Sequence, residues 1–470
     1  LFSGSLFKLS LKGDVAVMKK ETLLKGGLIV TPSKTFRSDI LVRDGVIQAI
    51  GLGLLTKQSP KVEVIDASNL HVLPGVVDPH SHLWEAGFIS GADFEDSSTS
   101  AVVGGITTII DMPLTTPEVL DIRSFNDKID IGLESSHVDF ALHGGVRPSN
   151  LNELREMWEA GATAFKIFTC DTGCPMHGVI NDSDLLAAMK TIASFGGLAT
   201  FHAENNQLLI SNKADLEAKG RKDNAAFNEW RNETVELEAI NRILFYAERT
   251  GTRVNIVHVT SPKGVEMISR ARKQGIDATA ETCPHYLYFT EKDIEERGAW
   301  LTCSPPMRGV DARNGMRQLI NSGAISTIGS DHGPVDPKFK QSGHNNIFNA
   351  QPGMPMNETM VPLMLNLVIA GEFSIERFAE VSAEWPAKLY GLYPKKGTIQ
   401  IGSDADFTVV DLESRWVVKA ENLIGKSGWT PFENMELAGR VVMTIIRGRV
   451  AARNGKPVGE LGKASFVARR

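Results

Sequence analysis

The sequence is poor in cysteine, with four in 470 residues. So few cysteines exclude a disulfide framework of the kind that holds small secreted proteins together. Cys170 and Cys174 are separated by three residues, but no second pair with zinc-site spacing accompanies them. We therefore expect free thiols, a reducing compartment and a cytoplasmic location.

Long apolar runs and a strong excess of one charge are also missing. No apolar run reaches the ~18 residues that a membrane helix requires, so we expect no membrane partner. Lysine and arginine total 50 against 56 acidic residues, a net charge of −6 without a basic stripe. This balance argues against a nucleic-acid partner and is typical of a globular enzyme.

The two chain ends stand apart from the rest. Residues 1–17 lack an initiator methionine, and Met18-Lys19-Lys20 resembles a natural start, so we expect 1–17 to be an added leader. Residues 459–470 form a basic tail that needs a surface to pack on. A subunit interface and simple disorder both remain open for it.

The most informative stretch is Asp78-Pro79-His80-Ser81-His82, directly after the apolar run 72–77. On a strand, residues i and i+2 face the same side, so both imidazoles can reach one ion. Imidazole suits zinc and its first-row neighbours. One such pair alone is equally compatible with core or surface histidines, so the rest of the chain must decide.

Four later apolar runs also end in a charged or metal-binding residue. A polar group at the end of a buried strand is costly unless it has a purpose. These runs are residues 162–166, 198–202, 254–258 and 325–331. The candidate metal ligands are therefore His80, His82, Lys166, His202, His258 and Asp331.

Strands and helices alternate along the central part of the chain. Further strands are predicted at 106–112, 138–143 and 277–283, which makes eight, and helices at 152–160, 182–194, 233–250, 264–274 and 312–321. This alternation predicts an α/β fold, a (β/α)8 TIM-like barrel, over residues 73–393. Active sites of such barrels lie at the carboxyl ends of the strands, where the candidate ligands fall.

The flanks carry short strand-like runs instead. Asp44-Gly45 predicts a hairpin turn near the start of the chain, and Arg447-Gly448-Arg449 predicts a turn near its end. We expect residues 18–72 and 394–458 to form one small β-sandwich domain built from both chain ends, followed by the tail 459–470.

Lys166 is the odd member of the candidate ligand set. An ammonium group cannot bind a metal ion and would repel it. A lysine that has added carbon dioxide is a carbamate, an anion with two oxygens that can bridge two metals. The alternative is that Lys166 pairs with a carboxylate in the barrel mouth.

From Met18 onward the chain resembles the amidohydrolase superfamily, and within it the cyclic amidohydrolases: hydantoinases, dihydropyrimidinases and allantoinases. The matching motifs are PGVVDPHSH (74–82), GGITTIIDMP (104–113), FK (165–166), HAEN (202–205), VHVTS (257–261), ETCPHYL (281–287), SPPMR (304–308), GSDHG (329–333) and the segment 396–406.

The resemblance implies two divalent ions per chain, Zn²⁺ or alternatively Mn²⁺ or Co²⁺, and a homotetramer. It implies that His80 and His82 hold the more buried ion together with Asp331. His202 and His258 hold the second ion, and carboxylated Lys166 bridges the two. A bridging hydroxide then attacks the ring carbonyl, Asp331 transfers the proton, and the Ser304 backbone contacts the ring amide of a small cyclic diamide.

A few positions bear on which of these three enzyme types the chain resembles. Asp171 occupies the position at which dihydropyrimidinases carry an oxyanion-stabilising tyrosine. Trp84, Phe88 and Phe168 are candidates to line a pocket for an apolar 5-substituent, or are ordinary rim or core aromatics. We therefore expect a hydantoinase that gives N-carbamoyl amino acids. The alternatives are an allantoinase, a dihydropyrimidinase, or a non-catalytic assembly protein, against which the retention of all six ligands counts.

Overall fold

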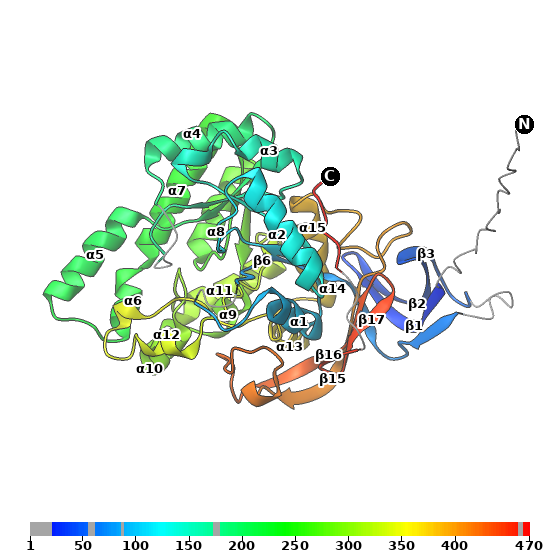
Figure 1. Ribbon diagram of the computed structural model, residues 1–470. Helices are drawn as coiled ribbons and strands as arrows, with labels where there is room; N and C mark the ends of the chain where they lie inside the picture. The colour runs from blue at the N-terminus through cyan, green and yellow to red at the C-terminus, as the bar shows by residue number, and fades with distance from the viewer. Residues whose placement is uncertain (1–20, 55–61, 86–88, 173–178, 459–463) are drawn as a thin grey trace, which may run out of the picture.

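The computed structural model describes residues 21–54, 62–85, 89–172, 179–458 and 464–470. Residues 1–17, Phe88, Cys174 and the first part of the tail, 459–463, lie outside the described residues. The described chain forms a barrel and a separate sheet at its side (Figure 1). Among its helices, none combines the length and the apolar character needed to cross a membrane.

The barrel consists of parallel strands, as predicted. Its strands are β6 (Val76–Ser81), β7 (Ile106–Asp111), β8 (Asp139–Leu142) with its continuation β9 (Gly144–Gly145), β10 (Phe165–Phe168), β11 (Leu198–His202), β12 (Arg253–Ile256), β13 (Ala278–Thr282) and β14 (Thr327–Ile328). Counting β8 and β9 as one position gives eight strands. The predicted (β/α)8 fold is confirmed.

Hydrogen bonds beyond the regular ladders close the barrel. The amide of Asp331 donates to the His80 carbonyl at 2.9 Å, and the amide of His82 donates to the His332 carbonyl at 2.9 Å. The buried Asp78 carboxylate accepts from the Ser330 amide at 2.9 Å and from its hydroxyl at 2.6 Å. This seam joins the first strand to the last and sets Asp331 beside the two histidines of β6.

Helices cover the outside of the barrel. The predicted helix 233–250 is α7 (Glu233–Thr250), which begins at the Asn232 cap and ends at Gly251 with φ of 69°. The other predicted helices correspond to α3 (Leu154–Glu159), α4 (Asp182–Ala193), α8 (Pro262–Lys273) and α11 (Val310–Asn321). The sequence did not predict α1 (Phe94–Gly104), α2 (Ile122–Ser135), α5 (Asn206–Ala218), α6 (Ala225–Trp230), α9 (Pro284–Tyr288), α10 (Glu291–Arg297), α12 (Pro337–Gln341), α13 (Met360–Ile369), α14 (Ile375–Ala379) or α15 (Trp385–Leu389).

The second sheet is built from both ends of the described chain, as predicted. Its strands are β1 (Glu21–Thr31), β2 (Lys34–Arg43), β3 (Val46–Gly51), β4 (Glu63–Asp66), β5 (His71–Pro74), β15 (Phe407–Val417), β16 (Glu436–Ile446), β17 (Arg449–Arg453) and β18 (Lys456–Pro457). They are hydrogen-bonded into one continuous sheet, in which β5 pairs with β15. In Figure 1 the blue strands therefore lie beside the orange and red ones.

Both predicted turns are present, and both join antiparallel strands. Asp44 and Gly45 have φ of 52° and 82°, and Arg447 and Gly448 have φ of 46° and 72°. Two consecutive positive φ values are the signature of the type I′ turn, whose twist matches that of the flanking strands. The turns connect β2 to β3 and β16 to β17.

The described part of the tail, residues 464–470, packs on its own chain, which neither alternative left open by the sequence had anticipated. The Phe140 amide donates to the Ser465 carbonyl at 3.1 Å, the Val467 amide donates to the Phe140 carbonyl at 2.7 Å, and Phe466 forms a parallel β-bridge with Phe140. The Arg469 guanidinium lies 3.4 Å from the centre of the Trp158 ring. The tail therefore docks along β8 through a single β-bridge and the backbone hydrogen bonds on either side of it.

Candidate metal centre and substrate pocket

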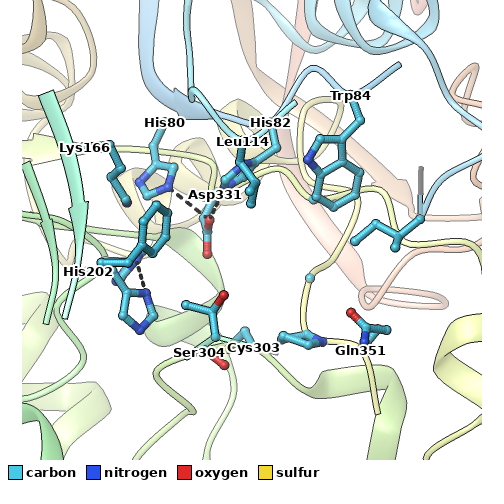
Figure 2. A pocket seen from close by; sticks show the side chains of 17 residues that line it. His80, His82, Trp84, Leu114, Lys166, His202, Cys303, Ser304, Asp331 and Gln351 are labelled. Carbon is cyan, nitrogen blue, oxygen red and sulfur yellow. Dashed lines mark hydrogen bonds and ion pairs between the residues drawn. The ribbon is translucent and has the colours of Figure 1, made fainter. Parts of the chain in front are cut away.

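All six candidate ligands lie at the carboxyl ends of barrel strands and line one pocket. His80 belongs to β6, Lys166 to β10 and His202 to β11, while His258 follows β12 and Asp331 follows β14. The four histidines and Lys166 are buried, and Asp331 is partly exposed. Figure 2 shows Lys166, His80, His202 and Asp331 at one end of the pocket, with Trp84 and Gln351 at the other.

The first group of donors is His80, His82 and Asp331. Asp331 Oδ1 lies 3.3 Å from His80 Nε2 and 3.6 Å from His82 Nε2. One ligand atom of each of the three residues lies within 4.8 Å of the others. These three atoms converge closely enough to share one cation.

The second group is His202 and His258, on neighbouring strands. His202 Nδ1 and His258 Nε2 are 3.2 Å apart, and the ring centroids are separated by 4.8 Å. The His202 ring also stacks on Phe168, at 5.8 Å between centroids.

Two glutamates lie behind the histidines and were given no role from the sequence. Glu281 Oε1 lies 2.8 Å from His80 Nδ1, and Glu204 Oε2 lies 2.8 Å from His202 Nε2. A carboxylate accepts from the ring N–H and leaves the other ring nitrogen with its lone pair facing the pocket. Glu204 is itself held by the buried Arg231. One signal was available: Glu281 lies in the predicted strand 277–283 and opens the motif 281–287.

Burial sets the protonation state of the four imidazoles. Desolvation lowers the pKa of His80, His82, His202 and His258, and nearby Lys166 lowers it further in each. The rings are therefore neutral at neutral pH, the form that binds a metal ion. Although burial raises the pKa of Glu204, Arg231 and His202 bring it below the usual value, so this group stays anionic.

Lys166 is 1% exposed and makes no ion pair among the described residues within 4 Å. Burial lowers its pKa to about 8, even though Asp331 and Glu281 act in the opposite direction. Its Nζ lies 5.0 Å from the centre of the Phe168 ring. The pairing with a barrel-mouth carboxylate, which the sequence had left open, is therefore not made in this structure.

Two of the candidate ligands have an unusual backbone conformation. His258 has φ of 42° and Asp331 has φ of 49°, in the left-handed region that costs side-chain-bearing residues about 1–3 kcal/mol. Packing leaves little freedom nearby, because a Cβ on Gly329 would lie 2.8 Å from the His80 Cβ. Strain held in place by close packing is typical of functional sites.

The predicted substrate residues divide into two sets. Trp84, Phe168 and Ser304 line the pocket, whereas Asp171 is exposed and is not among the lining residues. Its neighbour Thr172, which the sequence did not single out, lines the pocket instead. The remaining lining residues include Ile89, Leu114, Gln351, Pro352 and Gly353. The wall away from the ligands is thus largely apolar.

Known proteins share this chain's sequence and fold over nearly its whole length. An L-hydantoinase of Paenarthrobacter aurescens is 37% identical over 452 residues, 96% of this chain and 98% of that protein. An allantoinase of Deinococcus radiodurans is 34% identical over 444 residues, 94% of this chain and 97% of that protein. A solved structure of L-hydantoinase (dihydropyrimidinase) from Arthrobacter aurescens has a TM-score of 0.92 at 36% identity, covering 96% of this chain and 100% of that one.

These comparisons confirm the class of enzyme expected from the motifs, a cyclic amidohydrolase. The sequence pattern of the Amidohydrolase family matches residues 71–451, which include the whole barrel and the strands β15 and β16 of the second sheet. The chain therefore belongs to the amidohydrolase family.

Proposed function

We propose that this enzyme hydrolyses the cyclic amide bond of hydantoins with an apolar 5-substituent and releases N-carbamoyl amino acids. The observation that carries the proposal is one pocket with two unlike ends. Neutral imidazoles and Asp331 gather at one end, and Trp84 and Leu114 contribute to an apolar wall. L-hydantoinase relatives support the same substrate class.

The donor set fits a pair of divalent cations. His80, His82 and Asp331 would hold one ion, His202 and His258 would hold the other, and Lys166 would bridge them as a carbamate. Glu281 and Glu204 each lie against one ring nitrogen of His80 and His202, which leaves the other nitrogen of each ring to bind an ion and supports this assignment. Divalent ions held there would supply Lewis acidity and would lower the pKa of water. We assign Zn²⁺ first, with Mn²⁺ and Co²⁺ as alternatives.

Other groups of the pocket have proposed roles in proton transfer and substrate binding. Asp331 Oδ1 lies among the ligand atoms and is the group we propose to accept the proton of the attacking water and deliver it to the leaving ring nitrogen. The Ser304 backbone would hold the ring amide. Trp84 and Phe168 would bury the substituent and exclude water from the reacting carbonyl.

A substrate panel tests the proposal. We expect kcat/KM to be higher for 5-benzylhydantoin than for allantoin, and lowest for dihydrouracil, because each buried CH₂ group contributes roughly 0.8 kcal/mol. A clear preference for allantoin would transfer the assignment to allantoinase, which relatives such as that of Deinococcus radiodurans support. A preference for dihydrouracil would make the enzyme a dihydropyrimidinase.

Metal analysis of freshly purified, unchelated protein is the second test. We expect two divalent ions per chain; far less than one, with undiminished activity, would contradict the metal assignment. By the same family resemblance we propose a homotetramer, for which light scattering is the check. The free cysteines Cys170, Cys283 and Cys303 support a cytoplasmic location.

A further inference from the structure

Two hydroxyl groups that line the pocket, those of Thr172 and Ser304, make no hydrogen bond within the described part of the chain; of the two residues, Thr172 is the more buried. Thr172 lines the same pocket as Lys166 and His202, and its side chain is almost completely buried, at 7% exposure. Its Oγ1 makes no hydrogen bond among the described residues. Burying a hydroxyl without a partner is unfavourable, whereas valine would fill the same space without that cost. A hydrogen-bonding group that enters the pocket would remove this cost, and Thr172 lines the pocket where such a group would bind.

The backbone just before Thr172 is tied to the candidate metal centre. The Asp171 amide donates to Asn206 Oδ1 at 3.1 Å, and the Asp171 carbonyl accepts from Arg231 Nη2 at 3.3 Å. Arg231 in turn pairs with Glu204, the carboxylate that orients His202. One buried guanidinium thus fixes both a candidate ligand and the chain that carries Thr172, so their relative placement is set before a substrate binds.

The chemistry of the pocket limits what the partner is. A cyclic diamide presents carbonyl oxygens, and a threonine hydroxyl is a donor that suits them. Asp171 stands at the position of the tyrosine that donates in dihydropyrimidinases, but its side chain is exposed outside the pocket lining. We infer that Thr172 Oγ1 donates a hydrogen bond to a carbonyl oxygen of the bound cyclic diamide. This assignment rests on the proposed function.

Two substitutions at this position separate the hydroxyl from the methyl group. Thr172→Val removes only the donor, and we expect kcat/KM for the best hydantoin to fall about tenfold, as for a lost hydrogen bond of ~1.5 kcal/mol. Thr172→Ser keeps the donor and is expected to stay within about threefold of wild type. Metal content should be unchanged in both variants.

A matched control comes from the second sheet. Thr444 of β16 is also fully buried, and its Oγ1 is likewise without a hydrogen-bond partner in the described chain. Thr444→Val should therefore leave kcat and KM unchanged. Neither valine variant should lower the thermal midpoint, because neither loses an internal hydrogen bond. A fall in activity without a fall in stability is the result that a merely structural role for Thr172 would not produce.

Three outcomes overturn the inference. Wild-type activity of Thr172→Val would remove the hydroxyl from substrate binding. An equal loss in the valine and serine variants would assign the effect to packing of the methyl group. A wild-type enzyme that is inactive on every cyclic diamide would overturn the proposed function and this inference together, whereas the first two outcomes leave the proposed function standing.

Discussion

Lys128, Lys166, Lys340 and Lys396 are all buried in the described chain, and two of them, Lys166 and Lys396, have opposite surroundings. Lys166 makes no ion pair among the described residues within 4 Å. Lys396 is 1% exposed, and its Nζ lies 2.5 Å from Asp139, 2.6 Å from Asp406 and 2.9 Å from Asp404. Burial lowers the pKa of both. At Lys396 the three carboxylates outweigh it and raise the pKa above its usual range. At Lys166 burial prevails, and the pKa falls to about 8.

The difference teaches that the partners of a buried lysine, and not its burial, decide its role. Lys396 stays an ammonium and joins Asp139 of the barrel to the strand region of the second sheet. Lys166 lacks such partners, and its lowered pKa brings the uncharged amine closer to neutral pH than in an ordinary lysine. The acidic group Asp139, Asp404 and Asp406 has the spacing of a cation site, and the Lys396 ammonium lies within it.

The largest effect is expected at Lys166. Lys166→Ala should lose most of the bound metal and nearly all activity while remaining folded, because the carbamate that we propose to bridge the ions could no longer form. Small carboxylic acids should restore part of the activity by supplying those oxygens. Metal analysis and turnover with added acetate or propionate are the measurements. Full metal occupancy in Lys166→Ala would show that Lys166 has no role in holding the metal ions, and the proposed contrast with the structural Lys396 would be wrong.

The next largest effect is expected at Asp331, the group that we propose to transfer the proton in the same pocket as Lys166. Asp331→Asn should keep the fold and lower turnover by ~10²–10⁴, the range for general acid–base catalysis. The measurement is kcat on the best hydantoin, with metal content determined on the same sample. Near-native turnover with metal still bound would exclude Asp331 from proton transfer.

Lys396 should affect stability and leave the chemistry intact. Lys396→Met leaves buried carboxylates without their positive partner. We therefore expect a loss of about 3–5 kcal/mol in the free energy of unfolding, measured with denaturant. The control is Lys388→Met, which removes a surface lysine paired with Glu384 and should change stability by at most about 0.5 kcal/mol. Folded Lys396→Met should keep its turnover. Equal stability of the two variants would show that the three-carboxylate cluster contributes nothing.

The smallest effects belong to the glutamates behind the histidines. Glu281→Gln and Glu204→Gln should each weaken metal binding by about 10–100-fold, the usual effect of removing a carboxylate that orients a ligating histidine. Glu281 supports His80 and Glu204 supports His202, which belong to different groups of ligands. When metal is titrated into the metal-free protein, we therefore expect each variant to weaken a different one of the two binding steps. Loss of the same step in both would contradict the division of ligands into two groups.

The parts of the site that depend on local spacing were predictable from the sequence. His80 and His82 alternate on one strand, and Lys166 and His202 each end an apolar run, so strand geometry alone brings them to the same end of the barrel. The turns at Asp44 and Arg447 were predictable for the same reason, since two residues determine each turn.

What could not be predicted depends on contacts between distant segments. Glu281 matters because β13 places it behind His80, 201 positions away. Thr172 matters because Asn206 and Arg231 hold the chain before it, and no local pattern reveals that. The docking of residues 464–470 along β8 likewise arises from a pairing that neither segment encodes alone.

The pairing of β5 with β15 has a consequence for how the chain is made in the cell. Strands β1 to β5 leave the ribosome before the whole barrel, and β15 follows only after it. At ~5–20 residues per second this interval is on the order of tens of seconds. During it the inner edge of the early sheet offers unpaired backbone groups, the feature that drives edge-to-edge aggregation. We therefore expect yield to depend on translation speed and on chaperones that shield this edge. Protease sensitivity of residues 21–74 in ribosome-bound chains arrested before residue 407, lost in the finished protein, is the measurement.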